Sequence, residues 1–227
     1  MSNSSLVNCK VMSPNHSGTR THVIDRITPH CVVGQLSAEG IGSCFPKGAE
    51  ASCNYGIGTD GRVCLIVDEG NRSWCSSSRD NDQRAVTIEC ASDAKHPYAF
   101  NNKVYEKLVD LCVDICKRNG KTKLIWFGDK TKSLNYNPAS NEMVLTVHRW
   151  FANKACPGDW LYNRLGELAN KVNDRLNFVQ ASNSTAVDVN IKKLYRVQVG
   201  AFSNKNNAEK LRKELLAKGY DAIIKED

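Results

Sequence analysis

The segment Ala85-Val-Thr-Ile-Glu-Cys-Ala91, followed by Asn102–Asn119, decides how this sequence of 227 residues folds. The first segment is a short apolar run of the length of a buried strand. In the second, apolar residues recur at helical spacing, namely Val104, Leu108, Leu111, Cys112 and Ile115. They predict a helix with one buried face, with Asn102 as its N-cap and Gly120 just past its end. A strand followed by an amphipathic helix is typical of a layered α/β domain.

The same alternation of strands and helices extends in both directions along the chain. Thr21–Thr28 alternates apolar and polar residues and predicts a strand that Pro29 ends, and a short helix is expected within 32–45. Asp60-Gly61 lies between two strand-like runs and predicts a hairpin. Further elements are expected as strands at Lys123–Phe127 and Met143–Val147 and as a helix at Asp159–Leu176. We therefore expect the α/β fold class, with a mixed central sheet flanked by helices.

The C-terminal part of the chain has a different organisation. Residues 177–190 carry one charge and show no clear period, which is typical of a linker between a domain at 1–176 and a segment at 191–227. That segment predicts a small β-α-β unit, with strands at Leu194–Phe202 and Asp221–Ile224, a helix at Asn206–Lys218, and Ala208, Leu211, Leu215 and Leu216 facing inward. A unit of about 35 residues is too small to be stable through apolar burial alone.

Composition and charge exclude several classes of protein. With 41% apolar and 24% charged residues the chain is globular rather than disordered. No apolar run reaches the roughly 18 residues of a membrane span. Residues 1–5 lack the features of a secretory signal peptide, so we expect synthesis in the cytoplasm. The net charge is +7, and residues 191–227 hold nine Lys and Arg against five Asp and Glu. This excess favours an anionic or polymeric partner, although a solvated helix face also explains it.

Ten cysteines are scattered along the chain without the regular spacing of a disulfide framework. We expect most of them to be thiols. Cys90 is expected to fill volume in the core. Cys112 and Cys116 are four residues apart on a predicted helix, which allows a shared metal ion, but two core residues are the commoner case.

Two histidines and one cysteine are candidate metal ligands. His30 ends the run Ile27-Thr-Pro-His, His148 ends the run Leu145-Thr-Val-His, and Cys156 follows His148 by eight residues. Zinc is bound by imidazole and thiolate, and a catalytic zinc site has three protein ligands with a fourth position open. The sequence therefore allows a His₂Cys zinc site, although each of these residues taken alone is more often an ordinary core or surface residue.

Three motifs together resemble the type-2 N-acetylmuramoyl-L-alanine amidases, a family that includes phage amidases, bacterial autolysins and peptidoglycan recognition proteins. The motifs are Ile27-Thr-Pro-His30, Ser52-Cys-Asn-Tyr-Gly-Ile-Gly-Thr-Asp-Gly61, and His148-Arg followed after six residues by Cys156-Pro-Gly158. The resemblance covers about residues 20–175. It implies a zinc enzyme that hydrolyses the amide between N-acetylmuramic acid and L-alanine in peptidoglycan, with His30, His148 and Cys156 as the ligands of Zn²⁺.

The resemblance also implies catalytic roles for three further side chains. Lys154 matches a lysine that stabilises the oxyanion, Glu89 matches a strand glutamate that is the general base in some members, and Tyr55 matches a tyrosine near the zinc. Many relatives have His before that tyrosine, where this chain has Asn54. The alternatives are a solvated loop lysine for Lys154 and a strand-end salt bridge for Glu89.

The C-terminal segment resembles a second family. Val197-Gln-Val-Gly-Ala-Phe202 followed by Asn207-Ala-Glu-Lys-Leu211 is similar to the opening half of a SPOR-type repeat, a peptidoglycan-binding module. A complete module has two β-α-β halves, and this chain has one. The resemblance implies that the half-repeat pairs with its copy to form a homodimer, docks on the amidase domain, or is weakly folded.

These resemblances lead us to expect a zinc-dependent peptidoglycan amidase, made in the cytoplasm and acting on the cell wall after release through a membrane lesion. A phage or prophage endolysin fits this best. The alternatives are a bacterial autolysin of the same chemistry, a cytoplasmic recycling amidase, and a module that binds peptidoglycan without cleaving it. We expect no nucleic-acid partner and no membrane span.

Overall fold

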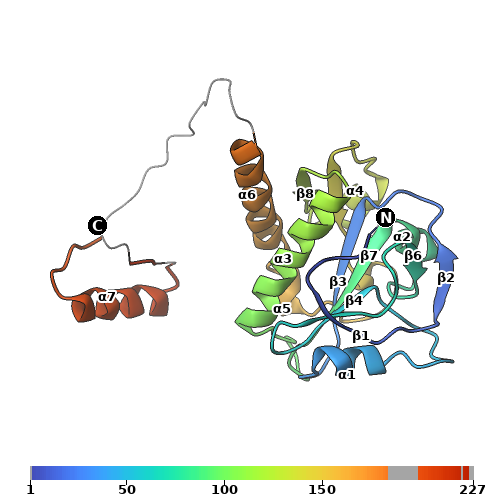
Figure 1. Ribbon diagram of the computed structural model, residues 1–227, viewed down its shortest axis with the longest axis horizontal. Helices are drawn as coiled ribbons and strands as arrows, with labels where there is room; N and C mark the ends of the chain where they lie inside the picture. Colours follow the sequence, from blue (N-terminus) through green and yellow to red (C-terminus); the bar gives the residue numbers. More distant parts are fainter. Residues whose placement is uncertain (1, 184–198, 221, 225–227) are drawn as a thin grey trace. The chain divides into compact units, whose positions relative to one another are not determined.

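The computed structural model describes residues 2–183, 199–220 and 222–224, and its course is shown in Figure 1. The chain divides into two compact units, residues 1–185 and residues 186–227. The first unit contains the sheet and every residue for which a catalytic or metal-binding role is expected. Within the described residues, no helix combines the length and the apolar character needed to cross a membrane.

The first unit is built around one mixed sheet, as expected. Its seven strands lie in the order β1 (Val7–Lys10), β5 (Val63–Leu65), β4 (Tyr55–Ile57), β7 (Ala85–Cys90), β3 (Arg26–Cys31), β9 (Glu142–Leu145) and β8 (Lys123–Ile125). All neighbours are parallel except β4 and β5, which form the predicted hairpin around Asp60-Gly61. The parallel strands from β4 to β8 therefore end at one edge of the sheet, where side chains from several strands can meet.

Helices cover both faces of this sheet. Gly56 in β4 faces α1 (Ala38–Ser43), because a Cβ built on it would lie 2.8 Å from the side chain of Ile41. Successive residues of a strand point to opposite faces, and the preceding Tyr55 belongs to the face covered by α3 (Asn102–Arg118), which packs against α6 (Leu165–Asn183). The main sheet thus has an α1 face and an α3 face.

The remaining elements are short. They are the two-stranded antiparallel sheet of β2 (His16–Thr19) and β6 (Asn71–Ser73), the helices α2 (Arg79–Arg84), α4 (Lys130–Asn135) and α5 (Asp159–Tyr162), and the 3₁₀ helix η1 (His148–Trp150). Of these, α5 corresponds to the start of the predicted helix at Asp159–Leu176, which the structure divides into α5 and α6.

Helix α3 matches its prediction closely. The five residues of its predicted apolar stripe are fully buried. The side chain of Asn101, one residue before the predicted cap, accepts a hydrogen bond from the Val104 backbone N–H. Gly120 follows the helix with φ +67°, a left-handed conformation that favours glycine.

Pro29 does not end its strand, contrary to the prediction. Strand β3 continues through Pro29 to Cys31 and pairs in register with β7 along its whole length. Ile27 accepts a hydrogen bond from Thr146 on the β9 side. Pro29, two residues further on, also faces that side, where pairing with β9 stops at Ile27. The missing N–H of Pro29 therefore costs no ladder hydrogen bond.

Helix α6 extends to Asn183, seven residues into the segment 177–190 that was predicted as a linker. Its buried residues Leu168, Val172 and Leu176 anchor the helix, and Arg175 pairs with Glu106 and Asp110 of α3. Once a helix is nucleated, each added residue gains a hydrogen bond at little cost, so a segment without its own apolar period can still extend it. The domain boundaries 1–176, 177–190 and 191–227 stay predictions.

The cysteines behave as expected for thiols. All ten are free. Cys90, Cys112 and Cys116 are fully buried in the hydrophobic core, and the Cys116 thiol contacts the sulfur of Met143 at 3.9 Å. Cys112 and Cys116 are thus core residues.

The second unit contains one described helix, α7 (Lys205–Ala217), close to the predicted Asn206–Lys218. The predicted strands at Leu194–Phe202 and Asp221–Ile224 lie partly outside the described residues, and their described parts, 199–202 and 222–224, are not strands. An isolated strand pair is marginally stable without further strands. Of the residues predicted to face inward, Ala208, Leu211 and Leu215 are half-buried, whereas Leu216 is exposed.

Candidate metal centre

His30 and Glu89 are brought together by the pairing of β3 with β7. The two residues are register partners, so their side chains share one face of the sheet. Gly56 is the partner of Glu89 on β4, and therefore this is the face covered by α1. His30 is completely buried, and its Nδ1 lies 3.9 Å from Glu89 Oε1.

His148 reaches the same place from the next strand. Beyond β9 the chain continues alongside β3, where the Thr146 hydroxyl is 2.7 Å from that of Thr28, and η1 begins at His148. The imidazole rings of His30 and His148 have their centroids 5.1 Å apart. Ser77, which has a left-handed φ of +61°, places its hydroxyl 2.9 Å from His148 Nε2. This contact orients the ring and leaves its other nitrogen available.

Cys156 lies on the loop after η1, and Arg149 holds this loop in place. The Arg149 backbone N–H donates to the Cys156 carbonyl, and its guanidinium donates to the Ala155 carbonyl. The same guanidinium pairs with Asp159. Gly158 is required where the loop turns, because it has φ +84° and a Cβ would lie 2.8 Å from the Pro97 carbonyl oxygen. As a result the Cys156 sulfur is 3.2 Å from His30 Nδ1.

The ligand atoms of His30, His148 and Cys156 all lie within 4.8 Å of one another. Ligands of a tetrahedral zinc ion, with bonds of about 2.0–2.3 Å, are about 3.3–3.8 Å apart, so small side-chain movements would close this set around one ion. The other nitrogen of His30, Nε2, is buried and has no hydrogen-bond partner. The fold therefore does not use up the polar atoms of this imidazole, and the donor set fits zinc.

The electrostatics of the three residues suit ligands. Burial, and then the nearby His148, lower the pKa of His30 well below its usual value, and burial followed by the charge of Lys154 lowers the pKa of His148. Both imidazoles are therefore neutral, as metal ligands must be. A hydrogen bond with Cys31, together with burial, raises the pKa of the Cys156 thiol well above its usual value. A bound cation would displace the proton of that thiol.

Glu89 is a buried carboxylate without a compensating cation. Its Oε2 is buried and has no hydrogen-bond partner. Its Oε1 contacts the Cys75 thiol at 3.9 Å. Burial raises the pKa of Glu89 to about 7. A carboxyl that changes its protonation state near neutral pH is suited to accept and donate a proton in catalysis. The alternative of a strand-end salt bridge to Lys or Arg is wrong, because the only ion-pair contact of Glu89 among the described residues is with the neutral His30.

Lys154 lies on the exposed part of the Cys156 loop, where its charge affects His148. Its backbone N–H donates to the Ala152 carbonyl, a contact that holds the turn and leaves the ammonium group unengaged by that bond.

Tyr55 is not brought to this centre, and its predicted role there is wrong. It pairs with Ile88 rather than Glu89, so its side chain lies on the α3 face of the sheet. The Tyr55 hydroxyl donates to Glu69 at 2.7 Å and accepts from the Ser4 backbone N–H. Glu69 in turn receives two hydrogen bonds from Arg118 of α3. The hydroxyl is thus part of a buried structural network.

Asn54, the residue that replaces the histidine of many relatives, also has a structural role. Its side-chain oxygen accepts hydrogen bonds from Arg20 and from the Thr87 backbone N–H, and its amide group donates to backbone carbonyls, including that of Val67. Every polar atom of this side chain is engaged within the fold.

Sequence reasoning missed three residues at the centre. Cys75 and Ser77 lie in the loop between β6 and α2, and Arg149 follows His148. Cys75 and Ser77 reach the centre only because Asp82 of α2 accepts hydrogen bonds from the backbone of this loop, including the Cys75 N–H at 3.0 Å. No local pattern in the sequence indicates this tertiary contact.

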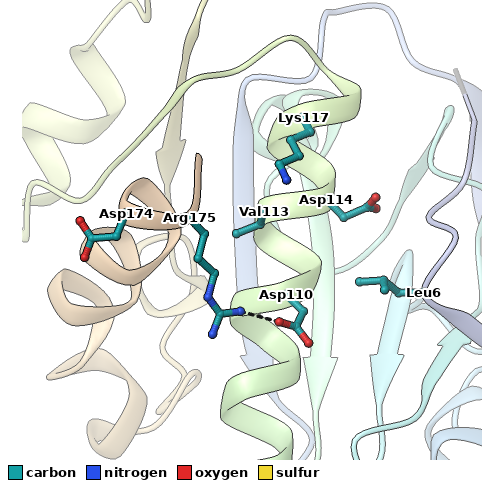
Figure 2. A pocket seen from close by; sticks show the side chains of 7 residues that line it. All are labelled: Leu6, Asp110, Val113, Asp114, Lys117, Asp174 and Arg175. Atoms are coloured by element: carbon teal, nitrogen blue, oxygen red, sulfur yellow. Dashed lines mark hydrogen bonds and ion pairs between the residues drawn. The ribbon is translucent and has the colours of Figure 1, made fainter. Parts of the chain in front are cut away.

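The hollow drawn in Figure 2 is separate from this centre. It lies beside α3 and α6, with a volume of about 540 Å³, and Val113, Asp110, Arg175 and Asp174 are among its lining residues. Arg175 bridges to Asp110 across it. None of the metal-site residues lines this hollow.

Comparisons with known families agree with the site. Residues 20–159 match the family described as N-acetylmuramoyl-L-alanine amidase, and residues 169–227 match the SPOR domain. The first match includes His30, Glu89, His148 and Cys156. The second begins within α6 and includes α7.

Solved structures show the same fold at low sequence identity. The hydrolase AmiA of Staphylococcus aureus is 13% identical, with a TM-score of 0.53 over 76% of this chain and 84% of that chain. PlyL is 18% identical, with a TM-score of 0.49 over 72% and 94%. The amidase LysCS of Clostridium intestinale is 15% identical, with a TM-score of 0.46 over 74% and 97%. No curated protein sequence matches the chain.

Proposed function

The chain belongs to the N-acetylmuramoyl-L-alanine amidase family and is a peptidoglycan amidase, and we propose that it works with Zn²⁺ held by His30, His148 and Cys156. The convergence of these three side chains within 4.8 Å carries the proposal. A bound zinc ion would supply Lewis-acid polarisation of the amide carbonyl and a lower pKa for attacking water. Two neutral imidazoles and one thiolate leave such a site with a net charge near +1, which suits an anionic transition state.

Glu89 is the proposed general base. Its Oε1 faces His30 on the edge of the site, and its pKa of about 7 allows it to take a proton from water and return it to the leaving amide nitrogen. A cation nearby favours the ionised form, so we expect the working pKa to lie below 7.

Lys154 is proposed to stabilise the oxyanion. Its charge already affects the neighbouring ligand His148, which supports a position beside the reacting carbonyl. An ammonium group aimed at developing negative charge contributes about 3–4 kcal/mol in comparable sites.

The decisive experiment measures turbidity loss of purified cell walls by the wild type and by His30→Ala, each with and without a chelator. We expect the wild type to release new alanine N-termini without new reducing sugar. Chelation or His30→Ala should lower the rate at least about 10³-fold. A module that only binds would bring down walls without releasing N-termini, and a metal-independent hydrolase would resist the chelator.

We further propose the biological role of a phage or prophage endolysin, made in the cytoplasm and released to the wall through a membrane lesion. The SPOR match supports action on polymeric wall, since a wall-binding segment has no use on soluble recycled fragments. The test is expression in a bacterial host, where lysis should follow only after the membrane is permeabilised. Lysis without permeabilisation would favour a secreted autolysin.

The SPOR segment is also proposed to form a homodimer. In the second unit Val199, Tyr220 and Ile223 are 62%, 64% and 87% exposed, and Phe202 and Leu216 are exposed as well. A 42-residue unit that leaves so many large apolar side chains in water gains stability by covering them. A second copy would cover them and would provide two-site attachment to the wall.

Sedimentation of the full chain against residues 1–183 tests this. We expect a concentration-dependent dimer for the full chain, a monomer for the truncated chain, and weaker dimerisation for Ile223→Ser. Two monomers would reject the pairing without affecting the amidase proposal.

A further inference from the structure

A second set of metal-ligating side chains adjoins the first. Cys75, Glu89 and His30 also have ligand atoms within 4.8 Å of one another. They come from the loop before α2, from β7 and from β3. Among the described residues these two sets of three share His30 and no other member, so they lie on two sides of the same imidazole.

The distances within the second set suit a metal ion. Glu89 Oε1 is 3.9 Å from His30 Nδ1 and 3.9 Å from Cys75 Sγ. Ligand atoms of a tetrahedral ion are about 3.3–3.8 Å apart, so the set would contract by only a few tenths of an ångström. Asp82 fixes the Cys75 backbone, which keeps the thiol in place before any ion binds.

The charges also call for a cation. Glu89 is buried beside a neutral imidazole, and its Oε2 has no partner. Asp82, itself largely buried, adds further negative charge beside Cys75. A buried carboxylate is normally paired with a cation or coordinates a metal.

We propose that His30, Cys75 and Glu89 form a second metal position for a thiophilic divalent cation such as Zn²⁺ or Cd²⁺. Because each residue offers one ligand atom and both sets need His30, the two positions are alternatives rather than a two-metal centre. The second set contains two anionic ligands when bound, a thiolate and a carboxylate, whereas the first contains one. An excess of metal therefore has a competing place to bind.

Occupation of the second position has a consequence that rests on the proposed function. Glu89 becomes a ligand and can no longer accept a proton, while His30 is withdrawn from the catalytic set. Excess Zn²⁺ should therefore inhibit the enzyme, and Cys75→Ser should relieve that inhibition.

Cobalt titration tests the site without relying on activity. In the full chain carrying His148→Ala and Cys156→Ser, the first set is broken and the second is intact. We expect this variant to bind one equivalent of Co²⁺ with a thiolate-to-cobalt charge-transfer band. Adding Cys75→Ser should abolish the band and weaken Co²⁺ binding at least about tenfold. Adding Cys112→Ser, a buried thiol of α3 remote from both sets, should leave the band unchanged.

The absence of a thiolate band in the first variant, with circular dichroism showing a folded chain, would overturn the proposal. So would a band that survives Cys75→Ser. If the double variant does not fold, the single variant Cys75→Ser provides the test. Equal inhibition of this variant and the wild type by excess Zn²⁺ would refute the site, and relief of the inhibition would support it. An inactive wild type would contradict the proposed function, while the cobalt band would still report on the second position.

Discussion

Two buried glutamates on opposite faces of the same sheet have opposite surroundings. On the α3 face, Glu69 is fully buried and accepts hydrogen bonds from Tyr55, Asn119 and, through both oxygens, Arg118. On the α1 face, Glu89 has one oxygen without any partner, and the other contacts only a thiol and a neutral imidazole. One carboxylate is satisfied within the fold, and the other is not.

The difference separates structure from chemistry. A fully paired buried charge fixes the fold and has no capacity left for a substrate or an ion. An unpaired buried carboxylate lowers stability and persists where a ligand or a reaction uses it. By this criterion the α1 face is the functional face, and Tyr55, whose hydroxyl belongs to the Glu69 network, is structural.

The largest expected effect compares the two glutamates in catalysis. Glu89→Gln removes the proposed proton acceptor and should lower the rate of wall hydrolysis about 10²–10⁴-fold. The wild-type rate should rise with pH up to about 7 as Glu89 ionises, and the residual rate of the variant should lose this rise. The matched variant Glu69→Gln should retain nearly the full rate per folded molecule, measured as released alanine N-termini. Equal losses in both variants would break the distinction.

The same two variants should change stability in opposite directions. Because the Glu89 pKa is raised to about 7 in the folded chain, the metal-free protein binds this proton more tightly than the unfolded chain does. Its contribution to stability is full below about pH 4.5 and is lost as pH rises through about 7. At pH 8 Glu89→Gln should therefore stabilise the metal-free chain by up to about 3 kcal/mol, whereas Glu69→Gln should destabilise it by about 3–5 kcal/mol. Urea unfolding at pH 4.5 and pH 8 measures both.

Arg149 extends the comparison to the loop that carries Cys156. Arg149→Ala removes the hydrogen bond to the Ala155 carbonyl and the pairing with Asp159, which together position the loop. We expect zinc affinity to fall about 10–100-fold, as for other supporting residues of metal sites. Arg62→Ala, which removes an exposed ion pair with Glu39, is the control and should leave the affinity unchanged. Competition with a chromophoric chelator gives the affinities.

The smallest effect is expected for Tyr55→Phe. Loss of one buried hydrogen bond to Glu69 should cost about 1–2 kcal/mol of stability. The rate per folded molecule should stay within about twofold of the wild type, because the ring lies on the face away from the metal centre. A hundredfold loss of rate at unchanged zinc content would return Tyr55 to the catalytic site.

Local sequence signals predicted most of the sheet and the main helix. Alternation, the Asp-Gly turn and the stripe of α3 depend on neighbouring residues, which is why β3, the β4–β5 hairpin and α3 were predicted within a few residues. The course of β3 through Pro29 and the extension of α6 into 177–183 were not, because both depend on what packs beside the segment.

By itself the sequence determined the donor chemistry of the centre: His30, His148 and Cys156 carry the motifs of an amidase, and Glu89 lies in a recognisable strand. Only the tertiary structure decided which side chains share a face. A register shift of one residue moves a strand side chain to the opposite face, so Tyr55 and Glu89, both in recognisable motifs, are separated by the sheet. The same pairing brings Cys75 to Glu89 from a loop with no local signal, since proximity across a fold is set by packing and not by neighbours in the chain.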